Sequence, residues 1–196
     1  MTTDLDIAAI GTRAAQILTA IQQHPLHTHL TESSLKYTCC WFTTTGYATI
    51  ADWNVEQDSP KLAVEGLRVL ALKAAVLEAT GDEKRAELLV AAPVDEMVHA
   101  ILAQWNVMTK IQEDLGIRFA HATDLEEFGY EIGGETDQLY AAAGWGDKPM
   151  RYWLPTSEVN RRLDVLGRLY ETIGIQGHGA TTSINFDEPA SASAAG

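Results

Sequence analysis

The segment KLAVEGLRVLALKAAVLEAT, residues 61–80, constrains the fold more than any other part of the chain. Read as a helix, it is apolar over more than half of its circumference, so other elements must cover it on several sides. Asp58, Ser59 and Pro60 supply a helix cap followed by a proline, and Gly81 supplies a stop. We therefore expect a central, well-buried helix from Lys61 to about Thr80, around which the rest of the domain assembles.

Several other segments repeat apolar residues at the spacing of a helix. They predict helices over residues 5–23, 83–90, 93–115, 136–143 and 156–174. The helices that start at Lys61, Pro93 and Thr156 are expected to build the core. The prediction is a mainly α protein, with a single helical domain of five or six helices over residues 1–174.

Two segments have a different composition. Residues 35–53 are rich in aromatic and β-branched side chains, which predicts a short hairpin or an extended segment packed on the helices. The adjacent Cys39 and Cys40 within it exclude a disulfide framework; reduced thiols are the first interpretation, and a reactive or metal-binding pair is the alternative. Residues 175–196 are rich in Gly, Ser and Ala, which predicts a flexible tail, with a docking segment as the alternative.

The charge balance narrows the range of partners. A net charge of −13 over 196 residues repels phosphate backbones and anionic lipid, so we expect neither nucleic-acid nor membrane-surface binding. The sequence has no run approaching the roughly 20 apolar residues that span a bilayer. Its first residues carry acids before any base, unlike a signal peptide. These features predict a cytoplasmic protein.

The helix predicted over residues 93–115 carries the main candidate site. At 100° per residue, one face gathers its large apolar side chains, namely Val94, Met97, Val98, Ile101, Trp105 and Met108. His99 and Asp95 lie one turn apart on the opposite, solvent-facing side.

Three interpretations of this pair stay open. Asp95 and His99 could form a surface pair, or they could pin the loop beyond Gly116 by hydrogen bonds. They could also meet His121, with Asp124 as an alternative carboxylate, around a metal or a substrate. Two histidines and one carboxylate suffice to bind zinc or non-haem iron.

Two further groups are candidates for binding. His27 and His29 would point the same way in an extended segment and could add metal ligands, although a solvated connection is the simpler interpretation. Trp145, Lys148, Arg151 and Trp153 combine aromatic rings and positive charge in an acidic protein, so they are candidates for ligand or partner contact. The alternative is that these aromatic rings pack over the edge of a helix.

The residues around His99 and His121 resemble the helical module of the glycine-rich domain-containing family in its compact bacterial form. The resemblance spans about residues 61–153 and rests on three short segments. The matching residues are Pro93, Val94, Asp95, His99 and Leu102, then Gly116, Phe119 and His121, then Tyr140, Gly146, Pro149 and Trp153. Val98 stands in place of the family's Trp, and Ala120 or Ala122 in place of a second His. The resemblance implies that Asp95, His99 and His121 are neighbours in space.

No common catalytic or phosphate-binding motif occurs in the sequence, and the set of family histidines is incomplete. The first hypothesis is therefore a non-catalytic helical binding or accessory protein that acts through a protein or peptide partner. The alternative is a small metal-dependent enzyme that uses zinc or iron at His99, His121 and Asp95.

Overall fold

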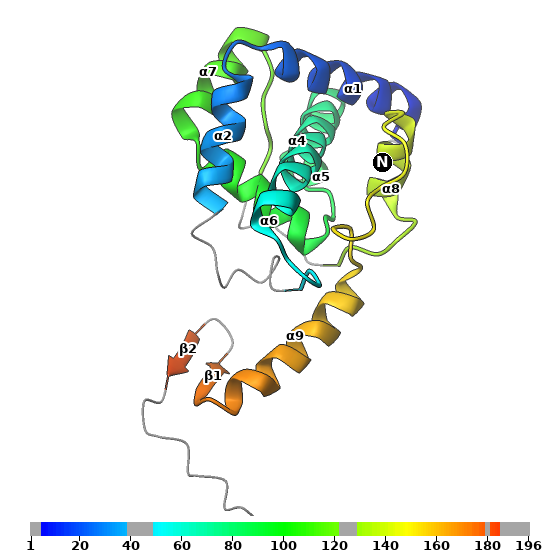
Figure 1. Cartoon of the computed structure of the whole chain (residues 1–196). Coiled ribbons are helices and arrows are strands. Elements are labelled where there is room, and N and C mark those ends of the chain that lie inside the picture. The colour runs from blue at the N-terminus through cyan, green and yellow to red at the C-terminus, as the bar shows by residue number, and fades with distance from the viewer. Residues whose placement is uncertain (1–4, 39–48, 122–128, 179–180, 185–196) are drawn as a thin grey trace, which may run out of the picture.

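A computed structural model describes residues 5–38, 49–121, 129–178 and 181–184, and this part of the chain is mainly helical (Figure 1). Its eight helices are α1 (Ile7–Gln23), α2 (His27–Thr38), α4 (Val55–Thr80), α5 (Glu83–Ala86), α6 (Ala92–Leu102), α7 (Trp105–Leu115), α8 (Glu135–Ala142) and α9 (Thr156–Glu171). Two short antiparallel strands follow, β1 (Ile175–His178) and β2 (Thr181–Ile184). Within the described residues, no helix has the length and apolar character needed to cross a membrane.

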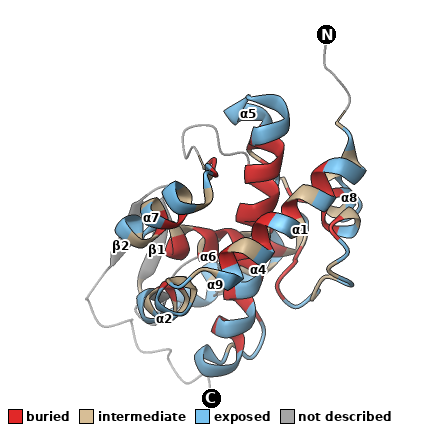
Figure 2. Ribbon diagram, turned by 90° about the horizontal axis from the view of Figure 1, so that it is seen from above, coloured by how far each residue is buried: buried red, intermediate tan, exposed pale blue. Residues whose placement is uncertain are grey.

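Helix α4 is the centre of the fold, as its apolar circumference predicts. Figure 2 shows buried residues along much of its length, and α1, α2 and α6 pack against it. The helix starts at Val55, earlier than predicted, because Asn54 is its N-cap and accepts a hydrogen bond from the Gln57 amide. Pro60 therefore lies inside the helix. At the other end, Gly81 takes the left-handed conformation with φ of 68°.

The single helix predicted over residues 93–115 is in fact two helices, α6 and α7, separated at Ala103 and Gln104. The break changes which residues face the core. The residues of α6 that were expected to be buried, among them Met97 and Ile101, are buried, and so is Met108 of α7. Trp105 was expected on the same face, but it starts the new helix and is 71% exposed. The prediction failed here because neither proline nor glycine marks the break.

Three other expectations are corrected by the structure. Leu35–Thr38, predicted as the start of a hairpin or extended segment, belongs to α2, and the rest of that segment, with Cys39 and Cys40, lies partly outside the described residues. Helix α9 was expected in the core, but it extends away from the other helices (Figure 1), and Leu169 and Ile173 are exposed. The predicted flexible tail begins with β1 and β2.

Candidate metal centre

The three residues of the main candidate site come from two segments. Asp95 and His99 lie one turn apart on α6, and His121 lies in the segment that follows α7. Helix α7 ends at Gly116, which has a φ of 64° and turns the chain. Ile117 and Ala120 are buried, so the segment after the turn is fixed on the core immediately before His121.

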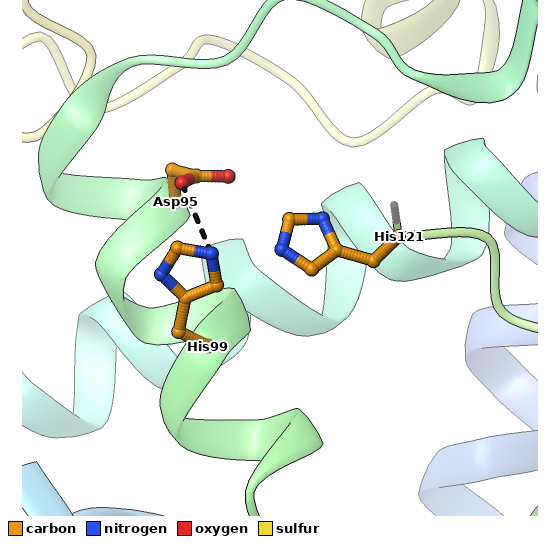
Figure 3. Close-up of side chains that lie close together, drawn as sticks. All are labelled: Asp95, His99 and His121. Carbon is orange, nitrogen blue, oxygen red and sulfur yellow. Dashed lines mark ion pairs between the residues drawn. The ribbon is translucent and has the colours of Figure 1, made fainter. Parts of the chain in front are cut away.

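The structure brings these three side chains together. Asp95 Oδ2 lies 3.7 Å from His99 Nε2, and the ring centroids of His99 and His121 are 4.7 Å apart. One ligand atom from each of the three residues lies within 4.8 Å of the others. Figure 3 shows the imidazole of His121 directed at the pair on α6. Asp95, His99 and His121 therefore converge on one point.

The helical wheel places Asp95 and His99 on a solvent-facing side of α6, but in the structure this side is only partly exposed. Asp95 is only 7% exposed, whereas the side chain of His99 keeps 33% of its surface. Residues of α9, among them Thr156 and Val159, line the same pocket as Asp95 and His99. A single-helix projection cannot show this second layer, because it comes from a segment about 60 residues further along the chain.

A buried ion pair lies next to Nδ1 of the His121 ring. Lys73 Nζ on α4 donates a hydrogen bond to Glu87 Oε2 at 2.6 Å and lies 3.1 Å from His121 Nδ1. Glu87 Oε1 lies 3.7 Å from the same ring nitrogen. The side chains of Lys73 and Glu87 are 1% and 6% exposed. Neither residue was a candidate in the sequence, because Lys73 lies within an apolar helix and Glu87 in a charged turn.

These contacts decide which nitrogen of His121 can bind an ion. Nδ1 is occupied by Lys73 and Glu87, whereas the buried Nε2 has no hydrogen-bond partner among the described residues. The Lys73 ammonium can only donate, so in its neutral form the ring accepts at Nδ1 and carries its proton on Nε2. Binding of a metal at Nε2 requires that proton to move to Nδ1. The Lys73 ammonium must then turn away from Nδ1 so that Glu87 Oε1, now 3.7 Å away, can approach as the acceptor. A carboxylate behind a metal-binding histidine is a frequent arrangement.

The spacing of the donor atoms is wider than in a loaded site. Four ligands at about 2.1 Å from zinc lie roughly 3.4 Å from one another. Asp95 and His99 are close to that separation already, at 3.7 Å. The widest separation in the group is within 4.8 Å, so closing it to about 3.4 Å requires side chains to approach by at most about 1.4 Å. The set of two imidazoles and one carboxylate therefore fits zinc or iron in chemistry and, after this adjustment, in distance.

The other histidine candidates do not join this centre. His27 and His29 are the first and third residues of α2, so their side chains point about 200° apart around the helix and do not face one another. The extended segment that would have aligned them is absent from residues 24–38, where α2 begins at His27. Asp124, the alternative carboxylate, lies outside the described residues.

The aromatic loop predicted to contact a ligand or partner is bound to its own protein. Trp153 is fully buried and donates through Nε1 to Glu65 at 2.8 Å, so it cannot contact a partner at the surface. Lys148 pairs with Asp137 and lies 3.8 Å from the centre of the Trp153 ring. Burial lowers the pKa of Lys148, against the opposing effect of Asp137.

The two remaining residues of this loop are also engaged. Arg151 Nε donates to Asp58 Oδ1 at 2.8 Å, and Trp145 packs edge-on against Tyr140. These contacts fit the packing alternative for Trp153, whereas the Arg151 side chain keeps 40% of its surface exposed. The residues of this loop close it onto α4 through Asp58 and Glu65.

Comparison of the chain with models of known protein families, with curated proteins and with solved structures found no match. The resemblance to the glycine-rich domain-containing family stays a prediction from short motifs. The geometry of Asp95, His99 and His121 is therefore the basis for a functional assignment.

Proposed function

We propose that this protein binds one divalent transition-metal ion, zinc or iron(II), through Asp95, His99 and His121, and that it is a small metal-dependent enzyme. The observation that carries the proposal is the convergence of three donor atoms within 4.8 Å of one another, from residues up to 26 positions apart. Convergence of this kind supports a site more strongly than the local pair of Asp95 and His99, which any helix can place one turn apart.

The number of ligands favours catalysis over a structural role. Structural zinc sites use four protein ligands, whereas catalytic sites use three and keep a position for water or substrate. Two histidines and one carboxylate with open positions also form the usual set for non-haem iron(II) enzymes. The centre lies near the surface, since the His99 side chain is 33% exposed, although its Nε2 atom is itself buried. Zinc at such a position lowers the pKa of its bound water to about 7.

Metal titration of single-residue variants tests this proposal. Protein purified without a histidine tag is stripped of metal and titrated with Zn²⁺ and with Co²⁺, whose visible spectrum reports coordination. We expect one ion per chain for the original protein. His99→Ala and His121→Ala should bind at least about 100-fold more weakly, since each removes one of three ligands.

The matched control is His29→Ala, which removes an exposed histidine outside the centre. Its affinity for both ions should equal that of the original protein. Equal affinity in all three variants, or no binding by the original protein under conditions where it is folded, would overturn the proposal. Unfolding curves of the stripped proteins identify any variant that fails to fold.

A second candidate function is partner binding by an accessory protein, which was the first hypothesis from the sequence. The observation that favours it is the set of exposed apolar side chains on and after α9, Val165, Leu169, Tyr170 and Ile173. A photo-crosslinking residue at position 169, introduced in the producing cells, should form a discrete protein adduct. The same residue at Glu113, an exposed position on α7, should form none. Identical adducts from both positions would count against this candidate.

A further inference from the structure

A pocket of about 390 Å³ adjoins the three converging residues. It lies between α6 and the first turns of α9, and Asp95 and His99 form part of its wall. His121 is not among the residues that line the pocket. A molecule in the pocket would therefore touch two residues of the centre. The volume is at the lower end of the roughly 300–1,000 Å³ range of small-molecule sites.

The walls of the pocket combine apolar surface with a few polar groups. Val90, which precedes α6, and Ala92, its first residue, contribute apolar surface, and Val159 and Leu163 contribute it from α9. Thr156 and Asn160, also on α9, offer a hydroxyl and an amide that can donate or accept hydrogen bonds. Mixed walls of this kind fit a small molecule with an apolar body and a polar group.

The charges around the pocket disfavour an anion. Asp95 and Glu96 both line it, and none of its lining residues in the described part of the chain is Lys or Arg. A divalent ion held by the centre would carry two positive charges, which these two carboxylates balance. The neighbouring Lys73 and Glu87 balance each other. The loaded pocket therefore has no net positive charge to attract an anion, and no net negative charge to favour a cation.

We infer that this pocket is the ligand site of the metal centre and that it takes a small, uncharged molecule with a short apolar part. This inference rests on the proposed metal site. The apolar part lies against Val159 and Leu163, and the polar group reaches the open coordination position beside Asp95 and His99. Thr156 and Asn160 supply the hydrogen bonds that orient the molecule.

Probe ligands on the cobalt-loaded protein test the inference. Pyrazole and 4-methylpyrazole are uncharged nitrogen ligands that differ by one methyl group, and acetate and azide are small anions. We expect 4-methylpyrazole to change the visible spectrum at a lower concentration than pyrazole, and both at lower concentrations than either anion. Leu163→Trp should fill part of the pocket and weaken 4-methylpyrazole at least 10-fold while cobalt affinity stays the same.

Val165→Trp is the matched control, because it adds the same ring to an exposed position of α9 outside this pocket. It should bind 4-methylpyrazole as the original protein does. Stoichiometric cobalt with tighter binding of acetate or azide, or with equal 4-methylpyrazole affinity in Leu163→Trp, would overturn the pocket inference alone. Absence of cobalt binding would overturn the metal site and this inference together.

Discussion

The buried pair of Lys73 and Glu87 gives the sharpest test of how the centre is built. Glu87→Gln keeps the shape of the side chain but leaves the Lys73 ammonium buried without its charged partner. The two side chains are 1% and 6% exposed, so water cannot replace the lost carboxylate. Removal of one partner of such a pair costs about 3–5 kcal/mol. For a chain of this size, a loss of about 1 kcal/mol lowers Tm by about 2–4 °C, so the expected fall is roughly 6–20 °C.

The assay is thermal and urea unfolding of metal-free protein, followed by circular dichroism. Glu78→Gln is the matched control, because it breaks the exposed pair of Glu78 with Arg13, whose side chains are 33% and 43% exposed. An exposed pair contributes about 0–1 kcal/mol. A double variant, Lys73→Met with Glu87→Leu, removes both charges and should recover most of the stability that Glu87→Gln loses.

The same variants separate a structural role of Glu87 from its role behind His121. Glu87→Gln replaces the charged acceptor near Nδ1 by a neutral amide, which should weaken metal binding by about 10–100-fold. Glu78→Gln should leave metal affinity unchanged. A free energy of unfolding of Glu87→Gln within about 1 kcal/mol of the original protein would contradict a buried ion pair here, because a buried ammonium cannot lose its carboxylate at so small a cost.

Three further predictions concern the fold and the site. Gly11→Ala should destabilise the protein by about 1–3 kcal/mol in urea unfolding, because a Cβ there would lie 2.5 Å from a side chain of α8; Gly167→Ala, with open space around it, should not. Hydrogen bonds from Arg151 hold the pKa of Asp58 well below its usual range, so Asp58→Asn should cost about 1–3 kcal/mol at pH 7. This cost should fade as pH falls below about 4, where the unfolded carboxyl takes up its proton, and an equal cost at pH 3 and pH 7 would contradict it. Asp95→Asn should weaken metal binding at least about 100-fold in the same Zn²⁺ and Co²⁺ titration, since it replaces one of the three ligands by a neutral amide.

The parts of the fold that follow from local pattern were predictable from the sequence. The central helix α4, the buried face of α6 and the short helix α8 each follow from apolar spacing and from residues such as Gly81 that end helices. Boundaries that depend on tertiary contacts were not. Asp58 was expected to start a helix, but its carboxylate binds Arg151 from 93 residues away. No local pattern indicates that pairing.

The three residues of the candidate site could be predicted from the sequence, but the ion pair beside His121 could not. The helical wheel placed Asp95 and His99 side by side, and the family resemblance added His121. Lys73 and Glu87 could not be found in this way, because a lysine in an apolar helix is informative only when its buried partner is known. Glu87, which pairs with Lys73, lies in another segment of the chain. Helix α9, which lines the pocket beside Asp95, is likewise distant in the sequence.

The stability of the metal-free protein distinguishes two interpretations of Asp95. It either holds a loop in place by a hydrogen bond or serves as a metal ligand. A carboxylate that pins a loop contributes a charge-assisted hydrogen bond, so its loss should destabilise the metal-free protein by about 1.5–3 kcal/mol. A carboxylate that serves mainly as a metal ligand stabilises the protein chiefly when the ion is bound, because binding to the folded state adds its free energy there. The core face of α6, with Met97 and Ile101 buried, already anchors the helix without Asp95. The metal-free stability of Asp95→Asn, measured beside its metal affinity, therefore decides between a structural pin and a ligand.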